Sequence, residues 1–134
     1  MIEITGLDHV VLRTSRMTEM LHFYSTVLGC AVERELPEET GLVQLRAGTA
    51  LIDLVAVDSE LGRVGGGPPT PGENNMDHFC LRLKAQPEEQ ISQYLAAHGI
   101  EVGAFERRYG AQGYGNSVYL SDPDGNTVEL RNQI

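Results

Sequence analysis

Two short segments of this chain, far apart in the sequence, are nearly the same. Residues 7–13 read LDHVVLR and residues 76–82 read MDHFCLR, so four of the seven positions are identical. Each copy carries one histidine, His9 or His78, at the same place in the motif. An internal repeat indicates two similar structural units. We therefore expect one histidine at the same position in each of two related modules.

The repeat extends beyond this motif, because each copy next changes from an alternating to a helical pattern. In the first copy a helix is expected to end at Gly29, and in the second a helix should begin near Pro87 and end at Gly99. The apolar positions with helical spacing are Met17, Met20, Leu21, Tyr24 and Leu28 in the first copy, and Ile91, Tyr94, Leu95 and His98 in the second.

Each copy then continues into three strand-like segments. They are expected at residues 30–33, 42–46 and 51–57 in the first copy, and at residues 100–102, 117–120 and 127–131 in the second. The predicted order in each copy is therefore β-α-β-β-β. The fold class is α+β, with two βαβββ modules that form a cup-shaped mixed sheet.

The module boundaries follow from the glycines and prolines between the copies. Residues 1–57 form the predicted first module and residues 76–134 the second, within one domain of 134 residues. Residues 58–75 contain the run GGGPP and are predicted to be a linker. A second glycine-rich segment, residues 107–115, is predicted to be a loop before the strand that begins at Ser117.

Strand parity places four polar side chains on one face of the predicted sheets. Alternate residues of a strand share a face, and apolar neighbours must pack against the helices. His9 and His78 then point away from the helices, and so do Asp53 and Glu129 in the last strands of the two copies. Unpaired polar groups on a concave face would be costly, so these four side chains need partners or a ligand.

Composition excludes some classes of partner. The net charge of −9 opposes binding to nucleic acid or to an anionic membrane, and no apolar stretch is long enough to span a bilayer. Two cysteines make no disulfide framework, and no signal-peptide core precedes the first strand. We expect a cytoplasmic protein that acts on a small molecule.

Three segments give the chain a family resemblance: residues 7–12 (LDHVVL), 23–29 (FYSTVLG) and 122–130 (DPDGNTVEL). Over residues 6–132 the chain resembles the vicinal oxygen chelate superfamily. That superfamily includes glyoxalase I, fosfomycin-resistance enzymes, methylmalonyl-CoA epimerase, extradiol dioxygenases and bleomycin-resistance proteins. None of the three segments identifies one reaction.

The resemblance implies a divalent metal held by His9, His78 and Glu129. Two imidazoles and a carboxylate form an N/O set that suits Zn, Mn, Ni, Co or Fe, and the identity of the metal stays open. Three protein ligands leave positions for a substrate that presents two oxygens. Asp53 is a further candidate, because glyoxalase I has a glutamate there as ligand and base. Aspartate is shorter, so Asp53 could be a ligand, a base or a residue at the rim of the cup.

Other residues are candidates for catalysis or substrate binding. Tyr119 and Ser117 face the cup by parity, and so does Gln44 in the first module. We expect Tyr119 to act in catalysis with Glu129 and Asp53, and Gln44 and Ser117 to bind substrate. The basic loop adds the substrate-binding candidates Arg107, Arg108 and Tyr114, which would suit an anionic oxygen substrate.

Three functions fit these residues. The first is a metal-dependent lyase or isomerase of the glyoxalase type, acting on a small oxygen-chelating substrate. The second is an Fe(II) extradiol-type dioxygenase, whose facial triad also contains two histidines and one carboxylate. The third is a non-enzymatic drug-binding protein of the bleomycin-resistance kind. A homodimer is expected in each case, because it would cover exposed sheet edges. Each site could lie within one chain or be shared between two.

Overall fold

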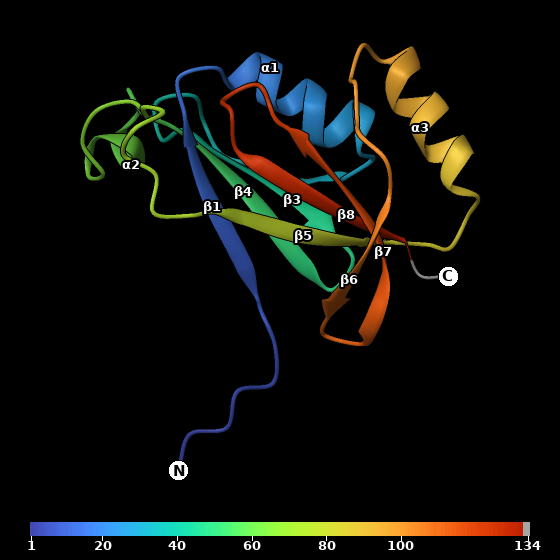
Figure 1. Cartoon of the computed structure of the whole chain (residues 1–134). Coiled ribbons are helices and arrows are strands. Elements are labelled where there is room, and N and C mark those ends of the chain that lie inside the picture. The colour runs from blue at the N-terminus through green and yellow to red at the C-terminus, as the bar shows by residue number, and fades with distance from the viewer. Residues whose placement is uncertain (133–134) are drawn as a thin grey trace. The chain divides into compact units, whose positions relative to one another are not determined.

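The computed structural model describes residues 1–132, so the last two residues of the predicted second module lie outside the described residues. The chain divides into two compact units, residues 1–73 and residues 74–134. The boundary falls inside the segment predicted to be a linker. Each unit contains one four-stranded mixed sheet with few helices (Figure 1), which confirms the predicted α+β class. No helix among residues 1–132 is long and apolar enough to cross a membrane.

The first unit contains strands β1 (His9–Thr14), β2 (Val32–Glu35), β3 (Leu42–Ala47) and β4 (Ala50–Ala56), in the spatial order β1-β4-β3-β2. Strand β1 runs parallel to β4, and the other pairs are antiparallel. The turn between β3 and β4 contains Gly48 with a φ of 61°. A positive φ suits glycine because it has no Cβ.

The predicted first helix is present but is not one regular α-helix. It consists of α1 (Met17–Leu21) followed by the π-helical segment η1 (His22–Val27). Phe23 and Tyr24 are neighbours in the sequence, yet both are buried, and their rings meet edge to face at 4.9 Å. Two adjacent aromatic side chains in the core explain why a strict α-helical period does not describe this segment.

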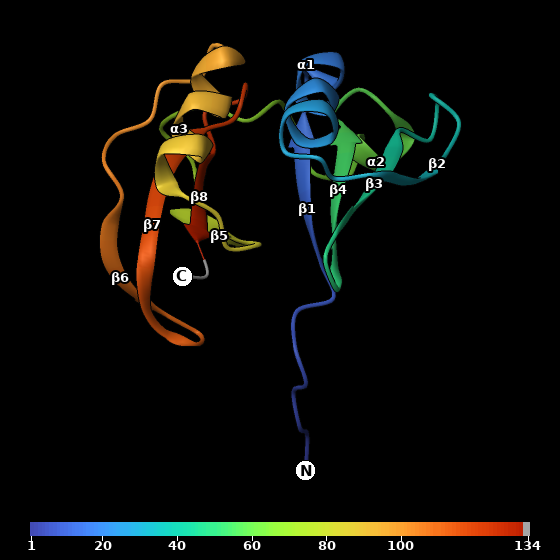
Figure 2. The ribbon, with the colours of Figure 1, turned by 90° about the vertical axis from the view of Figure 1, so that its right-hand side faces the viewer.

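The second unit repeats this architecture. It contains β5 (His78–Leu83), α3 (Glu88–Ala97), β6 (Glu106–Gly110), β7 (Gly113–Ser121) and β8 (Thr127–Asn132), with strand order β5-β8-β7-β6. Strand β5 is parallel to β8. Figure 2 shows that in each unit the helix lies along one face of its own sheet.

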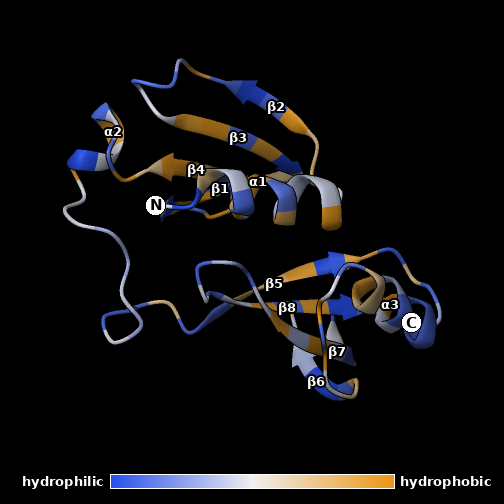
Figure 3. Ribbon diagram, turned by 90° about the horizontal axis from the view of Figure 1, so that it is seen from above, coloured by the Kyte–Doolittle hydropathy of each residue, from blue (hydrophilic) through white to orange (hydrophobic). Residues whose placement is uncertain are grey.

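The core of each unit lies between the helix and the sheet. In the first unit it consists mainly of Leu12, Met20, Phe23, Tyr24, Leu45, Ile52 and Leu54, and in the second of Ile91, Leu95, Val118, Leu120, Val128 and Leu130. Figure 3 shows the hydrophobic colour along much of β3 and β4. The other face of each sheet is left for the polar side chains between these apolar positions.

Two predictions about the second unit were wrong. Residues 100–102 form no strand, because Ile100 belongs to the end of α3: its N–H donates to Leu95 O while Gly99 N–H donates to Ala96 O. These two bonds and the φ of 76° at Gly99 are the Schellman arrangement that ends a helix. The second strand of this module is instead β6. The predicted loop at residues 107–115 is the β6–β7 hairpin.

The linker prediction also needs a correction, because residues 58–75 are not structureless throughout. A short helix, α2 (Glu60–Arg63), begins at Ser59, whose hydroxyl accepts from Gly62 N–H at 3.1 Å. The Arg13 guanidinium from β1 donates to the carbonyls of Gly62, Gly66 and Gly67 at 2.7–3.0 Å. The first half of the segment is therefore attached to the first unit. Residues 68–75 contain no helix or strand.

Candidate functional site

In the second unit the structure brings His78 and Glu129 together. Glu129 lies opposite Cys80 on the neighbouring strand, and His78 Nε2 is 3.1 Å from Glu129 Oε1. The Glu129 side chain is only 8% exposed, whereas that of His78 is 32% exposed. A carboxylate this buried needs a donor or a cation beside it. An imidazole nitrogen and a shielded carboxylate oxygen therefore face each other in direct contact.

The ring of each repeat histidine is oriented by the aspartate that precedes it. His78 Nδ1 lies 2.6 Å from Asp77 Oδ2, and His9 Nδ1 lies 2.7 Å from Asp8 Oδ1. In both rings this contact is made by Nδ1 and not by Nε2, which in His78 is the atom that meets Glu129. The hydrogen bond to Asp8 is the main cause that raises the pKa of His9 above its usual value. Sequence patterns did not indicate these contacts of Asp8 and Asp77, although both residues stand within the repeated motif.

Tyr119 and Cys80 flank Glu129 on the two neighbouring strands. Tyr119 is opposite Glu129 in the β7–β8 register, and its ring meets the His78 ring edge to face at 5.3 Å. Desolvation, followed by the charge of Glu129, raises the pKa of Tyr119 above its usual value. The same two causes raise the pKa of Cys80 to about 11. Both groups are thus protonated near neutral pH and can donate toward Glu129.

Arg108 and Ser117 lie on the same face but bind each other. Arg108 Nη1 donates to Ser117 O at 2.6 Å and to Ser117 Oγ at 3.0 Å, while Nη2 donates to Glu106 at 3.0 Å. The guanidinium also lies 4.3 Å from the centre of the Tyr119 ring. The guanidinium is therefore fixed by Ser117 and Glu106, and in this position it packs on the ring of Tyr119.

Arg107 and Tyr114 lie on the opposite face of the β6–β7 hairpin from Arg108. Arg107 and Arg108 are adjacent in β6, so their side chains alternate across the strand. The Arg107 guanidinium stacks at 3.7 Å on the ring of Tyr114, which meets Tyr109 edge to face at 5.1 Å. The structure therefore separates these two substrate-binding candidates from Ser117 and Tyr119.

In the first unit the structure brings Asp53 and Gln44 together. Gln44 Nε2 donates to Asp53 Oδ2 at 3.1 Å across β3 and β4. Asp53 is only 3% exposed, and its other oxygen, Oδ1, has no hydrogen-bond partner among residues 1–132. Asp53 also contributes to raising the pKa of His9 in the adjacent strand. Arg34 contacts Gln44 as well, a partner that sequence patterns did not indicate.

The donor set fits a borderline divalent metal. Imidazole and carboxylate ligands suit such ions, and a carboxylate behind each imidazole is the usual outer partner of a metal-binding histidine. The unpartnered buried oxygen of Asp53 also fits a nearby cation. Among residues 1–132, however, no group of three or more His, Cys, Asp or Glu side chains could hold a metal ion. The three-ligand set of His9, His78 and Glu129 stays a prediction.

The remaining two histidines lie away from these strands. His22 begins η1 and His98 follows the last residue of α3, where its ring packs on Tyr94 at 4.7 Å. Both cysteines are free thiols: Cys30 is buried and Cys80 exposed. Asp53 contacts Gln44, and His78 contacts Glu129, which are residues that strand parity placed on one face of each sheet. Sequence reasoning did not identify the side chains that hold the polar groups there.

Comparison with known proteins agrees with the predicted resemblance. The model of the Glyoxalase/Bleomycin resistance protein/Dioxygenase superfamily matches residues 6–130. The virulence protein STM3117 of Salmonella typhimurium is 30% identical over 133 residues, which cover 98% of this chain and 86% of that protein. The catechol-2,3-dioxygenase of Bacillus subtilis is 26% identical over 129 residues, which cover 96% of this chain but only 41% of the dioxygenase.

A solved structure gives the same result for the fold. The integron cassette protein VCH_CASS1 of V. cholerae matches with a TM-score of 0.76 at 24% identity, covering 100% of this chain and 99% of the other. The family match extends over both repeats, and the βαβββ order is present in each unit. The chain therefore belongs to the Glyoxalase/Bleomycin resistance protein/Dioxygenase superfamily.

Proposed function

We propose that this protein is a metal-dependent enzyme of the lyase or isomerase type, which acts on a small oxygen-chelating substrate. The observation that carries the proposal is the His78–Glu129 pair at 3.1 Å, with Asp77 behind the imidazole. The same Asp-His arrangement occurs at His9 in the first unit. A histidine that serves only as a packed or solvated residue has no need of such a partner in both copies.

The ligands proposed for the divalent metal are His9, His78 and Glu129, with Asp53 as a further candidate. When bound, the metal would supply Lewis acidity, which polarises a substrate carbonyl or epoxide. The protein itself supplies the proton donors. A tyrosine is protonated near neutral pH, and the raised pKa of Tyr119 keeps it so at higher pH, so its hydroxyl can donate to a substrate oxygen.

The geometry modifies the proposed substrate contacts. Ser117 has an exposed fraction of 0%, and Arg108 binds within the protein, with Nη1 donating to Ser117 and Nη2 to Glu106. Arg107 and Tyr114 bind each other on the other face of the hairpin. We therefore assign Arg108 to holding Tyr119, and we propose Tyr119 and Gln44 as the substrate contacts. The expectation of an anionic substrate loses its support, since it rested on the arginines.

The second candidate is an Fe(II) dioxygenase. It is favoured by the 26% identity to a catechol-2,3-dioxygenase and by the chemistry of two histidines with one carboxylate. The position of the other histidines argues against it. His22 and His98 lie on helical segments, so neither provides an acid-base histidine on the polar face of a sheet. Oxygen uptake by iron-loaded protein with a catechol, measured after anaerobic loading, distinguishes the two candidates.

Metal binding provides the test of the proposed site. The purified protein should bind about one divalent ion per chain, and saturating metal should raise its melting temperature by several degrees. His78→Ala should abolish both effects, whereas His98→Ala removes a histidine from the end of a helix and should change neither. Full metal stoichiometry in the His78→Ala protein, measured by elemental analysis after gel filtration, would show that the ligand assignment is wrong.

The role of Asp53 is tested separately. If Asp53 is a ligand, Asp53→Ala should weaken metal affinity by about tenfold or more. If it is a base, the metal should stay bound while turnover falls. Calorimetric titration with Zn²⁺ and Co²⁺ measures the first quantity. Unchanged affinity and unchanged turnover together would assign Asp53 to the rim of the site.

A further inference from the structure

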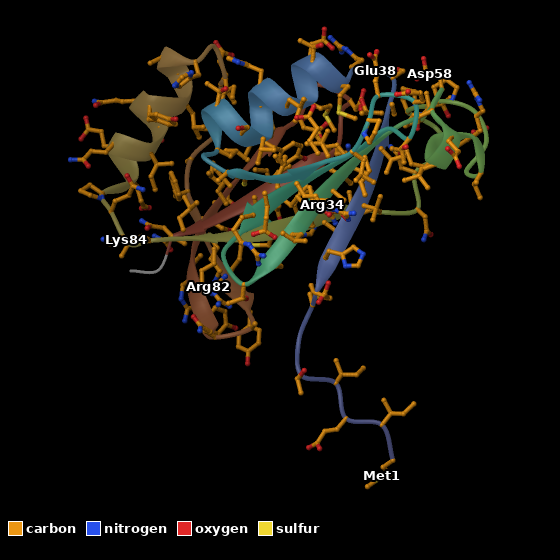
Figure 4. The ribbon with its side chains drawn as sticks, turned by 180° about the vertical axis from the view of Figure 1, so that it is seen from behind. Met1, Arg34, Glu38, Asp58, Arg82 and Lys84 are labelled. Carbon is orange, nitrogen blue, oxygen red and sulfur yellow. The ribbon has the colours of Figure 1, made fainter. Side chains whose placement is uncertain are left out.

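A line of three polar side chains crosses the first sheet from its edge strand to the candidate site. Arg34 on β2 donates from Nη1 to Gln44 Oε1 at 3.3 Å. Gln44 on β3 donates from Nε2 to Asp53 Oδ2 on β4 at 3.1 Å. The three residues are direct partners in the strand registers. Figure 4 labels Arg34 where its side chain lies over the strands of this sheet.

A β-bulge places Arg34 in this line. The register of β2 against β3 shifts by one residue between Val32 and Arg34, so Arg34 is opposite Gln44. With a regular register from Val32 onward, Glu33 would be opposite Gln44 and Arg34 would lie on the apolar face. Bulges commonly redirect a side chain next to a functional site. This bulge brings a guanidinium to the polar face.

The chemistry of the three groups fixes their orientation. A guanidinium can only donate hydrogen bonds, so the Gln44 oxygen must face Arg34 and the Gln44 NH₂ group must face Asp53. The NH₂ group donates its hydrogen bond to Asp53 Oδ2. Oδ1 then remains a buried acceptor that has no partner among the described residues, in a side chain that is 3% exposed. Such an oxygen is costly unless a donor or a cation reaches it.

We propose that Arg34 is a positioning residue, which acts through Gln44 to hold the Asp53 carboxylate with Oδ1 directed to a bound cation or to a hydroxyl of the ligand. The part of the site at Asp53 then selects ligands that carry a positive charge or a hydrogen-bond donor. This inference rests on the proposed function in one respect, since the cation used to test it is the proposed metal.

Electrostatics and positioning predict opposite effects of removing Arg34. Loss of a positive charge near a cation site strengthens cation binding, because the repulsion is removed. Loss of the positioning contact weakens binding, because Asp53 no longer has a fixed orientation. Arg34→Met should therefore weaken the affinity for Co²⁺ by roughly tenfold, a size typical of outer partners of metal ligands. Arg34→Lys keeps a donor and a charge, and should restore most of the affinity.

Arg46 provides the matched control. It lies on β3 of the same sheet, and its guanidinium pairs with Glu33 at 2.7–3.0 Å instead of with Gln44. Arg46→Met removes an equal charge from a neighbouring position and should leave Co²⁺ affinity unchanged or slightly tighter. A double variant tests the route: if Arg34 acts only through Gln44, Arg34→Met combined with Gln44→Leu should bind Co²⁺ no more weakly than Gln44→Leu alone.

A second measurement needs no metal. The side-chain amide signals of Gln44 in a ¹⁵N NMR spectrum, assigned from their loss in Gln44→Leu, should move in Arg34→Met and in Asp53→Asn. They should stay in place in Arg46→Met. Unmoved Gln44 signals in Arg34→Met, or Co²⁺ binding that is unchanged or tightened in that variant, would overturn the inference. If the wild-type protein binds no metal, the proposed function fails, and the amide signals alone then decide whether Arg34 positions Gln44 and Asp53.

Discussion

At the scale of single residues, each unit contains one buried carboxylate of the candidate site, Asp53 in the first unit and Glu129 in the second. Glu129 is buried among His78, Tyr119 and Cys80, of which Tyr119 and Cys80 have raised pKa values. Asp53 is buried beside Gln44 with one oxygen unpartnered. Each carboxylate thus has polar neighbours at fixed places, and Asp53 keeps one oxygen without a partner among the described residues. This arrangement favours a ligand that brings charge or donors of its own.

The raised pKa of Cys80 gives a prediction about reactivity. Although the residue as a whole is exposed, partial desolvation of the Cys80 thiol and the nearby Glu129 charge raise its pKa to about 11, from 9.0. At about pH 8 the reactive thiolate should therefore be about a hundredfold scarcer than in a free cysteine. In metal-free protein with Cys30→Ser, iodoacetamide should label Cys80 slowly. Glu129→Gln should accelerate labelling several-fold; equal rates would show that Glu129 does not act on the thiol.

The same shift affects stability at alkaline pH. The folded protein holds the Cys80 proton more tightly than the unfolded chain, in which the thiol ionises near pH 9. The free energy of unfolding should therefore fall as the pH rises from about 9 to about 11. In Cys80→Ser this part of the decrease should disappear. Urea unfolding across that range measures it, and identical pH profiles for the two proteins would contradict the assignment.

At the scale of elements, the β6–β7 hairpin depends on Arg131. Arg131 is 8% exposed, and its guanidinium donates to Arg108 O at 3.2 Å and to Gly113 O. A Cβ at Gly110 or Gly115 would come within 2.9–3.0 Å of it, so glycine leaves the space that this side chain fills. The hairpin in turn carries Arg108, which holds the ring of Tyr119.

Removal of this guanidinium should loosen the hairpin. Arg131→Leu leaves two carbonyls without their donor, and a loss of about 2–4 kcal/mol in the free energy of unfolding is expected. Arg82 is the matched control, because it is opposite Arg131 on β5 but exposed. Arg82→Leu should cost less than about 0.5 kcal/mol. Chemical denaturation of both variants measures the difference, and equal losses would mean that Arg131 does not anchor the hairpin.

The elements also show what could be predicted from sequence and what could not. Local signals were sufficient for the βαβββ order and for the polar face that holds His78 and Glu129, because alternation and turn residues are local. The strand predicted at residues 117–120 lies within β7, but the pairing of residues 106–116 was missed, since the glycines there are explained by Arg131 on another strand. The contact of Arg34 was missed because a bulge has no clear sequence pattern. Both the hairpin and the Arg34 contact depend on residues that are distant in the sequence.

At the scale of the whole molecule, assembly of the site stays a prediction. The chain supplies His9 from its first unit and His78 with Glu129 from its second. We expect a C2 homodimer with two metal sites, because β1 and β5 are edge strands of their sheets. Light scattering at micromolar concentration measures the mass, and a monomer would contradict this expectation.

Mixing two defective proteins tests whether chains share sites. His9→Ala and His78→Ala each lack one proposed ligand. If a site takes residues from two chains, a mixed dimer regains one complete site and some Co²⁺ binding. If each chain builds its own site, mixing restores nothing. Co²⁺ absorption after joint unfolding and refolding reports the result, with each single variant refolded alone as the control.

Because Arg13 binds residues 62–67, only the chain after Gly67 is a free tether between the two units. The length of this tether sets the effective concentration of one unit around the other. From Gly67 to His78 the chain spans at most roughly 35–40 Å, against roughly 60 Å for the full segment of residues 58–75. Shortening a tether by less than half changes the cost of closing it by only about 0.5 kcal/mol. That is about a twofold change in effective concentration. The tether therefore tolerates either mode of assembly, and the complementarity of the units' own surfaces must choose between them.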